Sequence, residues 1–242
     1  MQGQAEQEKA AAGRAAVREV RSGIRLGLGT GSTVRHFLDA LAEALEAGEI
    51  DDIVGVSTSE ETERRCRELG IPTTDPIDGS FALDLAVDGA DEVDPSLDLI
   101  KGLGGALLRE KIVVEAAARF VVIVDSAKRV TRLGTRSPLP VEVVPFGWRN
   151  HLEPFEAVGA RPVLRTRADG APYLTDNGNL VLDLHFAEGI HNPLSLDRTL
   201  RGRTGVVGTG LFTGCVDEVF IGTPSGVERL RRDAALHSEG PG

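Results

Sequence analysis

Short apolar runs alternate with amphipathic segments along the first half of the chain, and this alternation predicts its secondary structure. Residues 24–28, 53–57, 83–87 and 120–125 are short and largely apolar, as expected for strands buried on both faces. Helical spacing appears between the first two of these strands, at Val34, Phe37, Leu38, Leu41 and Leu45. The pattern therefore predicts an α/β fold with a buried, mostly parallel sheet.

Local signals add three helices to this pattern. Residues 5–21 are polar and rich in helix-forming side chains, and Ser22-Gly23 follows them as an end signal. The run Thr58-Ser59-Glu60-Glu61 fits a capping box at the start of a helix after the second strand. A further helix, over residues 105–118, leads into the strand at 120–125.

The pattern changes after about Arg136. Two strands, a helix and a hairpin are predicted there, at residues 137–145, 161–166, 148–158 and 173–186. Asn177-Gly178, between alternating residues, is the turn signal of the hairpin. Apolar stretches like those of the first half return at 205–212 and 218–223, and we expect them to complete the first sheet.

These patterns predict two domains. The larger, residues 1–136 plus 206–242, is a doubly wound, Rossmann-like catalytic domain with a mostly parallel sheet. The smaller, residues 137–205, is an inserted α+β domain of the ferredoxin-like type. The end of the chain, residues 238–242, is predicted to be disordered.

Composition narrows the possible functions. The formal net charge of −10 over 242 residues argues against a nucleic-acid partner, because proteins that bind nucleic acids concentrate Lys and Arg. No stretch approaches the roughly 20 apolar residues of a membrane span, so we expect a cytoplasmic protein with no membrane contact. Cys66 and Cys215 are far apart and without a CxxC partner, which argues against a zinc site or a disulfide framework.

Lysine is rare in this chain. The 27 Lys and Arg residues include only four lysines, at positions 9, 101, 111 and 128. Lysine is a compact point charge with a tunable pKa, whereas arginine is a planar group that stays charged. Its retention at a few positions indicates a need for that chemistry.

Polar loops follow the predicted strands at their carboxyl ends. They are residues 27–33, 57–59, 88–91 and 125–128. Open parallel sheets bind ligands in the crevice beyond those ends, so we expect these loops to form one site.

The first of these loops, GLGTGST at residues 27–33, has two interpretations. Its glycines, hydroxyls and following helix suit an anion. A tight strand–helix turn, capped by Ser32 or Thr33, explains it as well. It matches neither the Walker A pattern nor GxGxxG.

Glu110 is the sharpest single candidate. On the helix predicted over 105–118 it shares a face with Leu107, Val114 and Ala117, while Arg109 points away. A carboxylate on an apolar face has a raised pKa, which suits a general base near neutral pH. The alternative is a boundary glutamate whose carboxylate reaches water.

Asp88, Asp91, Lys101 and Lys128 carry the remaining chemistry. The two aspartates at a strand end suit metal ligands or loop caps, but DGADEVD lacks the features of a calcium loop. Lys101 stands before a glycine-rich turn, and Lys128 suits a phosphate as a point charge. The alternative for both lysines is an ordinary surface position, and the five histidines are scattered, so none is assigned a role.

Together these motifs resemble the type A family of ribose-5-phosphate isomerase. The matching stretches run in the family's order from about residue 9 to residue 230: GLGTGST, STSEET, VDGADEVD, KGLGGALLREKI, DSAK, LPVEVVP, TDNGN and IGTP. The combination of DGADE with KGxG and REK is far more specific than a single glycine loop.

The resemblance implies an aldose–ketose isomerase that acts through an enediolate without metal or cofactor. Glu110 is then the base that moves a proton between C2 and C1. Asp88 assists ring opening and transfers between oxygens, Asp91 supports hydroxyls, and Lys101 stabilises the enediolate oxygen. The residues expected around the substrate and its phosphate are Thr30, Gly31, Ser32, Thr33, Gly89, Ala90, Gly102, Gly104, Lys128 and Lys9.

The resemblance also implies a homodimer or homotetramer and a sugar phosphate as substrate. One position departs from the family, which commonly has three glycines after the lysine. Leu103 stands among Gly102, Gly104 and Gly105 here. It either points away from the substrate or constrains the loop.

Two other functions compete with this one. A related sugar-phosphate deaminase or lactonase is expected to use a histidine, and no histidine lies in these loops. A sensor that binds a sugar phosphate without turnover is expected to have lost its base, yet Glu110 and both aspartates are present.

Overall fold

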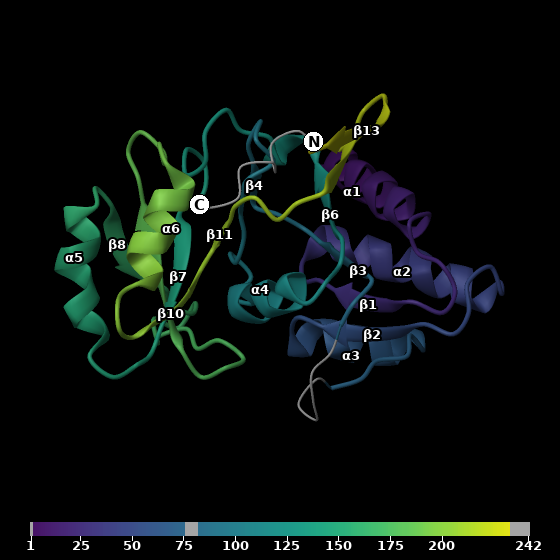
Figure 1. Ribbon diagram of the computed structural model, residues 1–242, viewed down its shortest axis with the longest axis horizontal. Helices are drawn as coiled ribbons and strands as arrows, with labels where there is room; N and C mark the ends of the chain where they lie inside the picture. The colour runs from purple at the N-terminus through teal and green to yellow at the C-terminus, as the bar shows by residue number, and fades with distance from the viewer. Residues whose placement is uncertain (1, 76–81, 233–242) are drawn as a thin grey trace, which may run out of the picture.

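The computed structural model describes residues 2–75 and 82–232, which form two units side by side (Figure 1). The predicted disordered end, residues 238–242, lies outside the described residues. No helix within the described ranges has both the length and the apolar character needed to cross a membrane.

The larger unit is built on a six-stranded sheet of order β13-β12-β6-β3-β1-β2. Every neighbouring pair is parallel except β12 and β13, which are antiparallel. The strands are β1 (Arg25–Leu28), β2 (Val54–Ser57), β3 (Leu85–Asp88), β6 (Phe120–Asp125), β12 (Glu218–Thr223) and β13 (Gly226–Arg231). The mostly parallel sheet is confirmed. β13 was not predicted, because its side chains are mostly exposed and form no apolar run.

Helices cover both faces of this sheet. They are α1 (Gln2–Val17), α2 (Ser32–Glu46), α3 (Glu60–Leu69) and α4 (Leu107–Glu115). Leu85 and Val87 of β3 pack in the apolar cluster of α1 and α2, while Ala86 between them packs with Val113 of α4. This alternation along one strand confirms the doubly wound arrangement.

Two helices differ at their ends from the prediction. α1 stops at Val17, because Arg18, Glu19 and Val20 donate to carbonyls three residues back and tighten the last turn. α4 begins at Leu107 rather than residue 105, because Gly105 has a φ of +86°. The predicted cap of α3 is confirmed, since Ser59 accepts a hydrogen bond from the backbone N–H of Thr62.

The smaller unit has the ferredoxin-like topology that the sequence predicts. Its antiparallel sheet has the order β10-β7-β9-β8. Along the chain its elements are β7 (Leu139–Val143), a short 3-10 turn (Trp148–His151) with α5 (Leu152–Ala157), β8 (Arg161–Leu164), β9 (Leu180–His185), α6 (Pro193–Arg201) and β10 (Val206–Thr209). The turn at Asn177-Gly178 is confirmed, because Leu174 and Leu180 pair across it.

The stretch at 205–212 does not join the first sheet as expected. β10 pairs with β7, and β11 (Leu211–Phe212) joins β5 (Leu99–Ile100) and β4 (Glu92–Val93) in a three-stranded sheet. The physical reason is that β10 supplies the last strand of the βαββαβ unit. The division into two domains stays a prediction, and we propose to extend the smaller one to Thr209.

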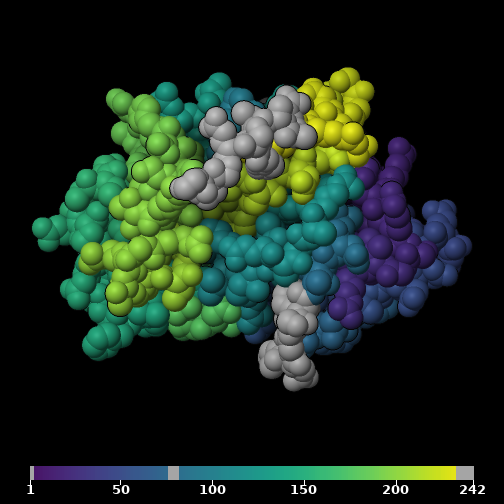
Figure 2. Space-filling model, viewed as in Figure 1, coloured from purple at the N-terminus to yellow at the C-terminus, as the bar shows by residue number. Residues whose placement is uncertain are grey.

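The chain returns to the larger unit after β11. Figure 2 shows its yellow C-terminal strands between the green smaller unit and the purple N-terminal helix. β12 and β13 contact α1 there, which ties the two ends of the described chain together.

Candidate active site

The loops at the carboxyl ends of the parallel strands meet around one cavity of about 90 Å³. It is lined by Thr30, Gly31, Ser32, Thr33, Gly89, Ala90, Asp91, Lys101, Gly102, Gly104, Glu110 and Lys128. These are all the residues that the sequence predicts for the site, except Asp88 and Lys9. Residues of the first, third and fourth predicted loops therefore line one cavity, whereas residues 57–59 do not.

Asp88 lies at the end of β3 and is 2 % exposed. Its Oδ1 accepts hydrogen bonds from the backbone N–H groups of Thr30 (3.0 Å) and Gly89 (2.7 Å). The β1 loop approaches so closely that a Cβ at Gly29 would stand 2.2 Å from this carboxyl group, so only glycine fits there. One oxygen of Asp88 is thus fixed by backbone, and the other faces Lys101.

Lys101 places its ammonium between two carboxylates. Its Nζ is 3.0 Å from Asp88 Oδ2 and 3.4 Å from Glu110 Oε1, and it donates to the carbonyl of Gly89 at 2.6 Å. The side chain is 2 % exposed. Its backbone is set by β5 and by a 2.9 Å hydrogen bond to the Gly210 carbonyl. The rare lysine at this position is therefore a buried charge and not a surface residue.

Glu110 lies in the first turn of α4, on the buried face with Leu107, Val113 and Val114. The apolar face that the spacing predicts is confirmed, and the alternative of a carboxylate in water is wrong, because Glu110 is 4 % exposed. Its Oε2 has no hydrogen-bond partner within the described residues. Burial, followed by the nearby charge of Asp88, raises the pKa of Glu110 to about 8.

Burial and the neighbouring charges shift the pKa values of all three groups. Burial also raises the pKa of Asp88, although Lys101 opposes the shift. Burial alone disfavours the ammonium of Lys101, but the charges of Asp88 and Glu110 outweigh it and the pKa of Lys101 is raised. Lys101 therefore stays charged, while each of its two carboxyl partners binds a proton more readily than an exposed carboxylate does.

A hydroxyl cluster holds the loop after β1. Thr30 Oγ1 contacts the hydroxyls of Thr58 (2.7 Å), Ser59 (2.8 Å) and Thr62 (3.2 Å), so this side chain turns toward the start of α3. Gly31 has a φ of +119° and precedes the first residue of α2. The segment is a tight strand–helix turn that opens a helix N-terminus onto the cavity. The expected cap by Ser32 or Thr33 is wrong, because Gly31 is the N-cap of α2 and no side chain of the described residues caps this helix.

A family model and several relatives match this chain over most of its length. The family model described as ribose 5-phosphate isomerase A (phosphoriboisomerase A) matches residues 54–226. Ribose-5-phosphate isomerase A of Roseiflexus castenholzii is 53% identical over 211 residues, with 87% of this chain and 89% of that protein covered. The protein of the same name from Synechococcus sp. is 48% identical, with 94% and 98% covered.

The chain belongs to the ribose 5-phosphate isomerase A family. Solved structures agree with this assignment. A D-ribose-5-phosphate isomerase in complex with phospho-erythronic acid has 41% sequence identity and a TM-score of 0.91, covering 94% of this chain and 99% of that one. The enzyme from Methanocaldococcus jannaschii has 37% identity and a TM-score of 0.88, covering 93% and 99%.

Leu103, the departure from the glycine pattern of this family, points away from the cavity. It is 40% exposed and does not line the cavity, whereas its neighbours Gly102 and Gly104 do. Positive φ angles occur at Gly102 (+99°) and Gly105 (+86°), but not at position 103. A side chain is thus tolerated there, and its backbone N–H donates to Asp91 Oδ2 at 2.9 Å.

Two predicted lysines differ in their placement. Lys128, in the short turn after β6 (Ser126–Lys128), is half-buried and lines the cavity. Lys9 on α1 does not line it, and its ammonium pairs with Glu6 at 2.8 Å. Its predicted contact with phosphate stays a prediction.

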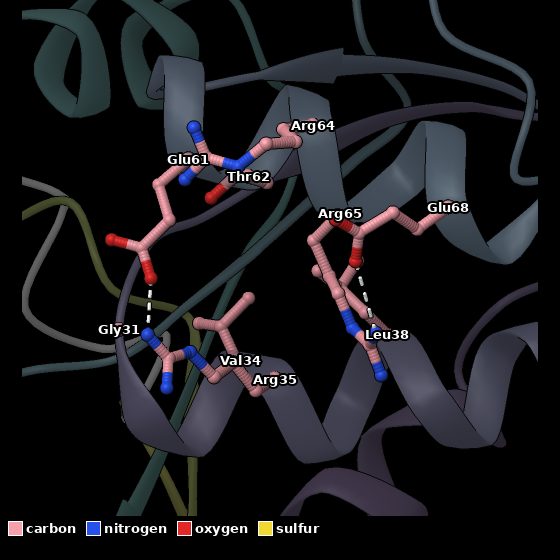
Figure 3. A pocket seen from close by; sticks show the side chains of 9 residues that line it. All are labelled: Gly31, Val34, Arg35, Leu38, Glu61, Thr62, Arg64, Arg65 and Glu68. Carbon is pink, nitrogen blue, oxygen red and sulfur yellow. Dashed lines mark hydrogen bonds and ion pairs between the residues drawn. The ribbon is translucent and has the colours of Figure 1, made fainter.

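A second cavity, of about 180 Å³, lies beside the first between α2 and α3 (Figure 3). Arg35 pairs across it with Glu61, and Arg65 pairs with Glu68 and Asp39. Two of its three arginines are thus paired with carboxylates, whereas Arg64 has no ion pair among the described residues, and the cavity contains none of the catalytic candidates.

Two residues that support the site are not predicted from the sequence. Phe212 of β11 lies with its ring centre 5.5 Å from Lys101 Nζ and 4.8 Å from Lys111 Nζ. Arg165, from the smaller unit, donates to the carbonyls of Gly102 and Leu103. Both reach the site from distant parts of the chain, and no local pattern marks them.

Proposed function

We propose that this chain interconverts D-ribose 5-phosphate and D-ribulose 5-phosphate, a step of the non-oxidative pentose phosphate pathway. Membership of the family supports this function. The observation that carries it is a buried carboxylate with a pKa of about 8, 3.4 Å from a buried ammonium, in a cavity at the sheet's carboxyl edge.

Glu110 is the proposed base. As a carboxylate it removes the proton from C2 of the open-chain aldose, and the electron pair moves onto the carbonyl oxygen at C1 to give an enediolate. The protonated Glu110 then returns the proton to C1, which leaves a carbonyl at C2. The raised pKa of Glu110 suits both steps, because a pKa near the working pH favours accepting and returning a proton.

Lys101 and Asp88 are proposed to act on the substrate oxygens O1 and O2, by stabilising charge and by transferring a proton. The Lys101 ammonium is already positioned when negative charge develops on the enediolate oxygen, so it stabilises that charge without reorganisation. Asp88, which has a raised pKa, gives and takes the proton that must pass between O1 and O2 and assists ring opening. Asp91 lies on the cavity wall and is proposed to accept from substrate hydroxyls.

The phosphate is proposed to lie at the start of α2 with Lys128. Backbone N–H groups at a helix N-terminus and a point charge suit a dianion. The backbone around Thr30, Gly31, Ser32 and Thr33 provides the first part of this grip. Gly89, Ala90, Gly102 and Gly104 form the rest of the wall against which the sugar packs. Lys9 is proposed to assist from α1.

The complex of a 41%-identical isomerase with phospho-erythronic acid supports this arrangement. That ligand is a phosphorylated sugar acid, and its carboxylate carries two oxygens on one carbon, with charge spread over both. An enediolate carries its two oxygens on adjacent carbons, but it shares with this carboxylate a negative charge on oxygen that the neutral substrate lacks, so a site built for that charge binds both.

We further propose a cytoplasmic homodimer or homotetramer that needs neither metal nor cofactor. The family resemblance supports the oligomer and the absence of a cofactor. Within the described residues no cluster of three or more His, Cys, Asp or Glu side chains is placed to hold a metal ion.

An isomerase assay tests the proposed function. Purified protein is expected to convert ribose 5-phosphate to ribulose 5-phosphate with no added metal, at a rate that EDTA leaves unchanged. Unphosphorylated ribose is the control and is expected to react far more slowly, because it cannot use the grip on the phosphate. No conversion of ribose 5-phosphate at any enzyme concentration would reject the proposal.

A further inference from the structure

The smaller unit reaches across to the glycine loop of the active site, residues 102–105. Arg165 Nη1 donates to the carbonyls of Gly102 (3.0 Å) and Leu103 (2.9 Å). The hydroxyl of Tyr173 donates to the carbonyl of Gly104 at 3.3 Å. Three consecutive carbonyls of the loop therefore accept hydrogen bonds from side chains of the smaller unit.

Arg165 is itself held in a fixed orientation. Asp183 of β9 accepts from its Nε at 2.9 Å and from its Nη2 at 2.5 Å. The two side chains are 12% and 16% exposed, so water competes little for either group. A bidentate pair fixes the plane of a guanidinium, and this leaves Nη1 aimed at the loop.

The loop depends on such support because glycines give it little stiffness of its own. Two of its residues, Gly102 and Gly105, have positive φ angles. The loop connects Lys101 to α4, which carries Glu110, and its Leu103 N–H donates to Asp91. A shift of the loop therefore changes the relative positions of Lys101, Glu110 and Asp91.

We propose that Arg165, oriented by Asp183, is a positioning residue for the isomerase reaction. It fixes the glycine loop and thereby the placement of the Lys101 ammonium relative to the Glu110 carboxylate. Arg165 does not line the cavity, so it acts through the loop and not on the substrate. The inference rests on the proposed function.

Kinetics of Arg165→Ala provide the first test. A misplacement of about 1 Å costs on the order of 10²-fold in rate, so we expect kcat to fall about 10- to 100-fold. KM is expected to stay within about threefold, because the phosphate grip belongs to other loops. Asp183→Asn is expected to lower kcat in the same direction by a smaller factor, since it loosens the guanidinium without removing it.

The matched control is Arg167→Ala. Arg167 lies two residues further along the chain and is 61% exposed, and Asp169 is its one ion-pair partner within residues 2–75 and 82–232. Its replacement is expected to leave kcat and KM unchanged. A wild-type kcat in Arg165→Ala would overturn the proposal.

Hydrogen exchange separates positioning from a general loss of stability. In Arg165→Ala, peptides that cover residues 102–106 are expected to exchange faster, while peptides of β6 exchange as in the wild type. Faster exchange throughout the chain would show a structural role only and overturn the inference. If the wild type lacks isomerase activity, the proposed function fails, and the exchange measurement still shows whether Arg165 holds the loop.

Discussion

Lys101 and Lys111 lie near the same ring, Phe212, yet their surroundings give them opposite properties. Both are largely buried. Lys101 faces the carboxylates of Asp88 and Glu110, and its pKa is raised. Lys111 donates to the carbonyls of Thr209 (2.9 Å) and Leu211 (2.7 Å), and burial lowers its pKa despite Asp197 at 3.8 Å.

The difference shows that burial alone does not make a lysine catalytic. Carbonyl oxygens satisfy the donors of Lys111 and join α4 to β10 and β11, which is a structural task. The ammonium of Lys101 instead lies between the carboxyl groups of Asp88 and Glu110, and all three line or adjoin a cavity. We therefore propose that two lysines ten positions apart have different tasks, with Lys101 in catalysis and Lys111 in holding the structure together.

Lys101→Met is expected to have the largest effect, a loss of kcat. Removing a preorganised charge from a developing oxyanion costs about 10²–10³-fold in kcat. Steady-state kinetics on ribose 5-phosphate measure the loss, and circular dichroism checks that the variant is folded. A kcat within threefold of the wild type would remove Lys101 from the mechanism.

Lys111→Met is expected to lower the stability of the fold and leave catalysis intact. Two buried carbonyls lose their donor, so the free energy of unfolding is expected to fall by about 1–3 kcal/mol. Urea denaturation measures this change, and kcat is expected to stay within about threefold. A large loss of kcat without loss of stability would contradict the division of tasks.

The pH dependence of kcat/KM is expected to be the next largest effect, up to tenfold per pH unit. Glu110 acts as a carboxylate and its pKa is about 8, so kcat/KM is expected to rise with pH and level off above about 8. Lys101 keeps its charge through this window, because its pKa is raised from 10.5.

The free energy of unfolding is expected to have the opposite dependence on pH. Since the fold raises the pKa of Glu110, its contribution to stability is complete below pH 4.5 and is lost as the pH rises through 8.

Initial rates from pH 6 to 9.5 measure this profile, with urea denaturation at the same pH values. A profile that is flat from pH 6 to 9.5, as expected for a carboxyl group with the ordinary pKa of 4.5, would contradict the buried base.

Lys128→Ala is expected to have the smallest effect. Loss of one charged contact with the phosphate raises KM by roughly tenfold and changes kcat little. Arg129→Ala is a suitable control, because this neighbour is exposed and pairs with Glu228. An unchanged KM in Lys128→Ala would remove it from the phosphate site.

Much of the catalytic cluster follows from local sequence. Helical spacing puts Glu110 on the apolar face of its helix, and strand ends place Asp88 and the phosphate loop at one edge of the sheet. These placements follow from helical periodicity and strand direction, both of which can be inferred from the local sequence.

The rest depends on contacts that no local pattern contains. Arg165 meets the glycine loop 62 residues away along the chain, and its role follows only from the packing of one unit on the other. The helix α6 is different, since its start carried a readable signal: Asn192 caps it and Pro193 occupies its first turn. That element was missed although the sequence contains its start signal.

Proton transfer by Glu110 is the central claim, and isomerisation in deuterium oxide tests it most directly. Because the proton on Glu110 exchanges with solvent between the two steps, wild-type protein is expected to place deuterium at C1 of ribulose 5-phosphate, as followed by proton NMR. Glu110→Gln is expected to lower both isomerisation and deuterium incorporation by ~10²–10⁴-fold, while binding of the sugar phosphate is retained. Incorporation at the wild-type rate in Glu110→Gln would contradict the account.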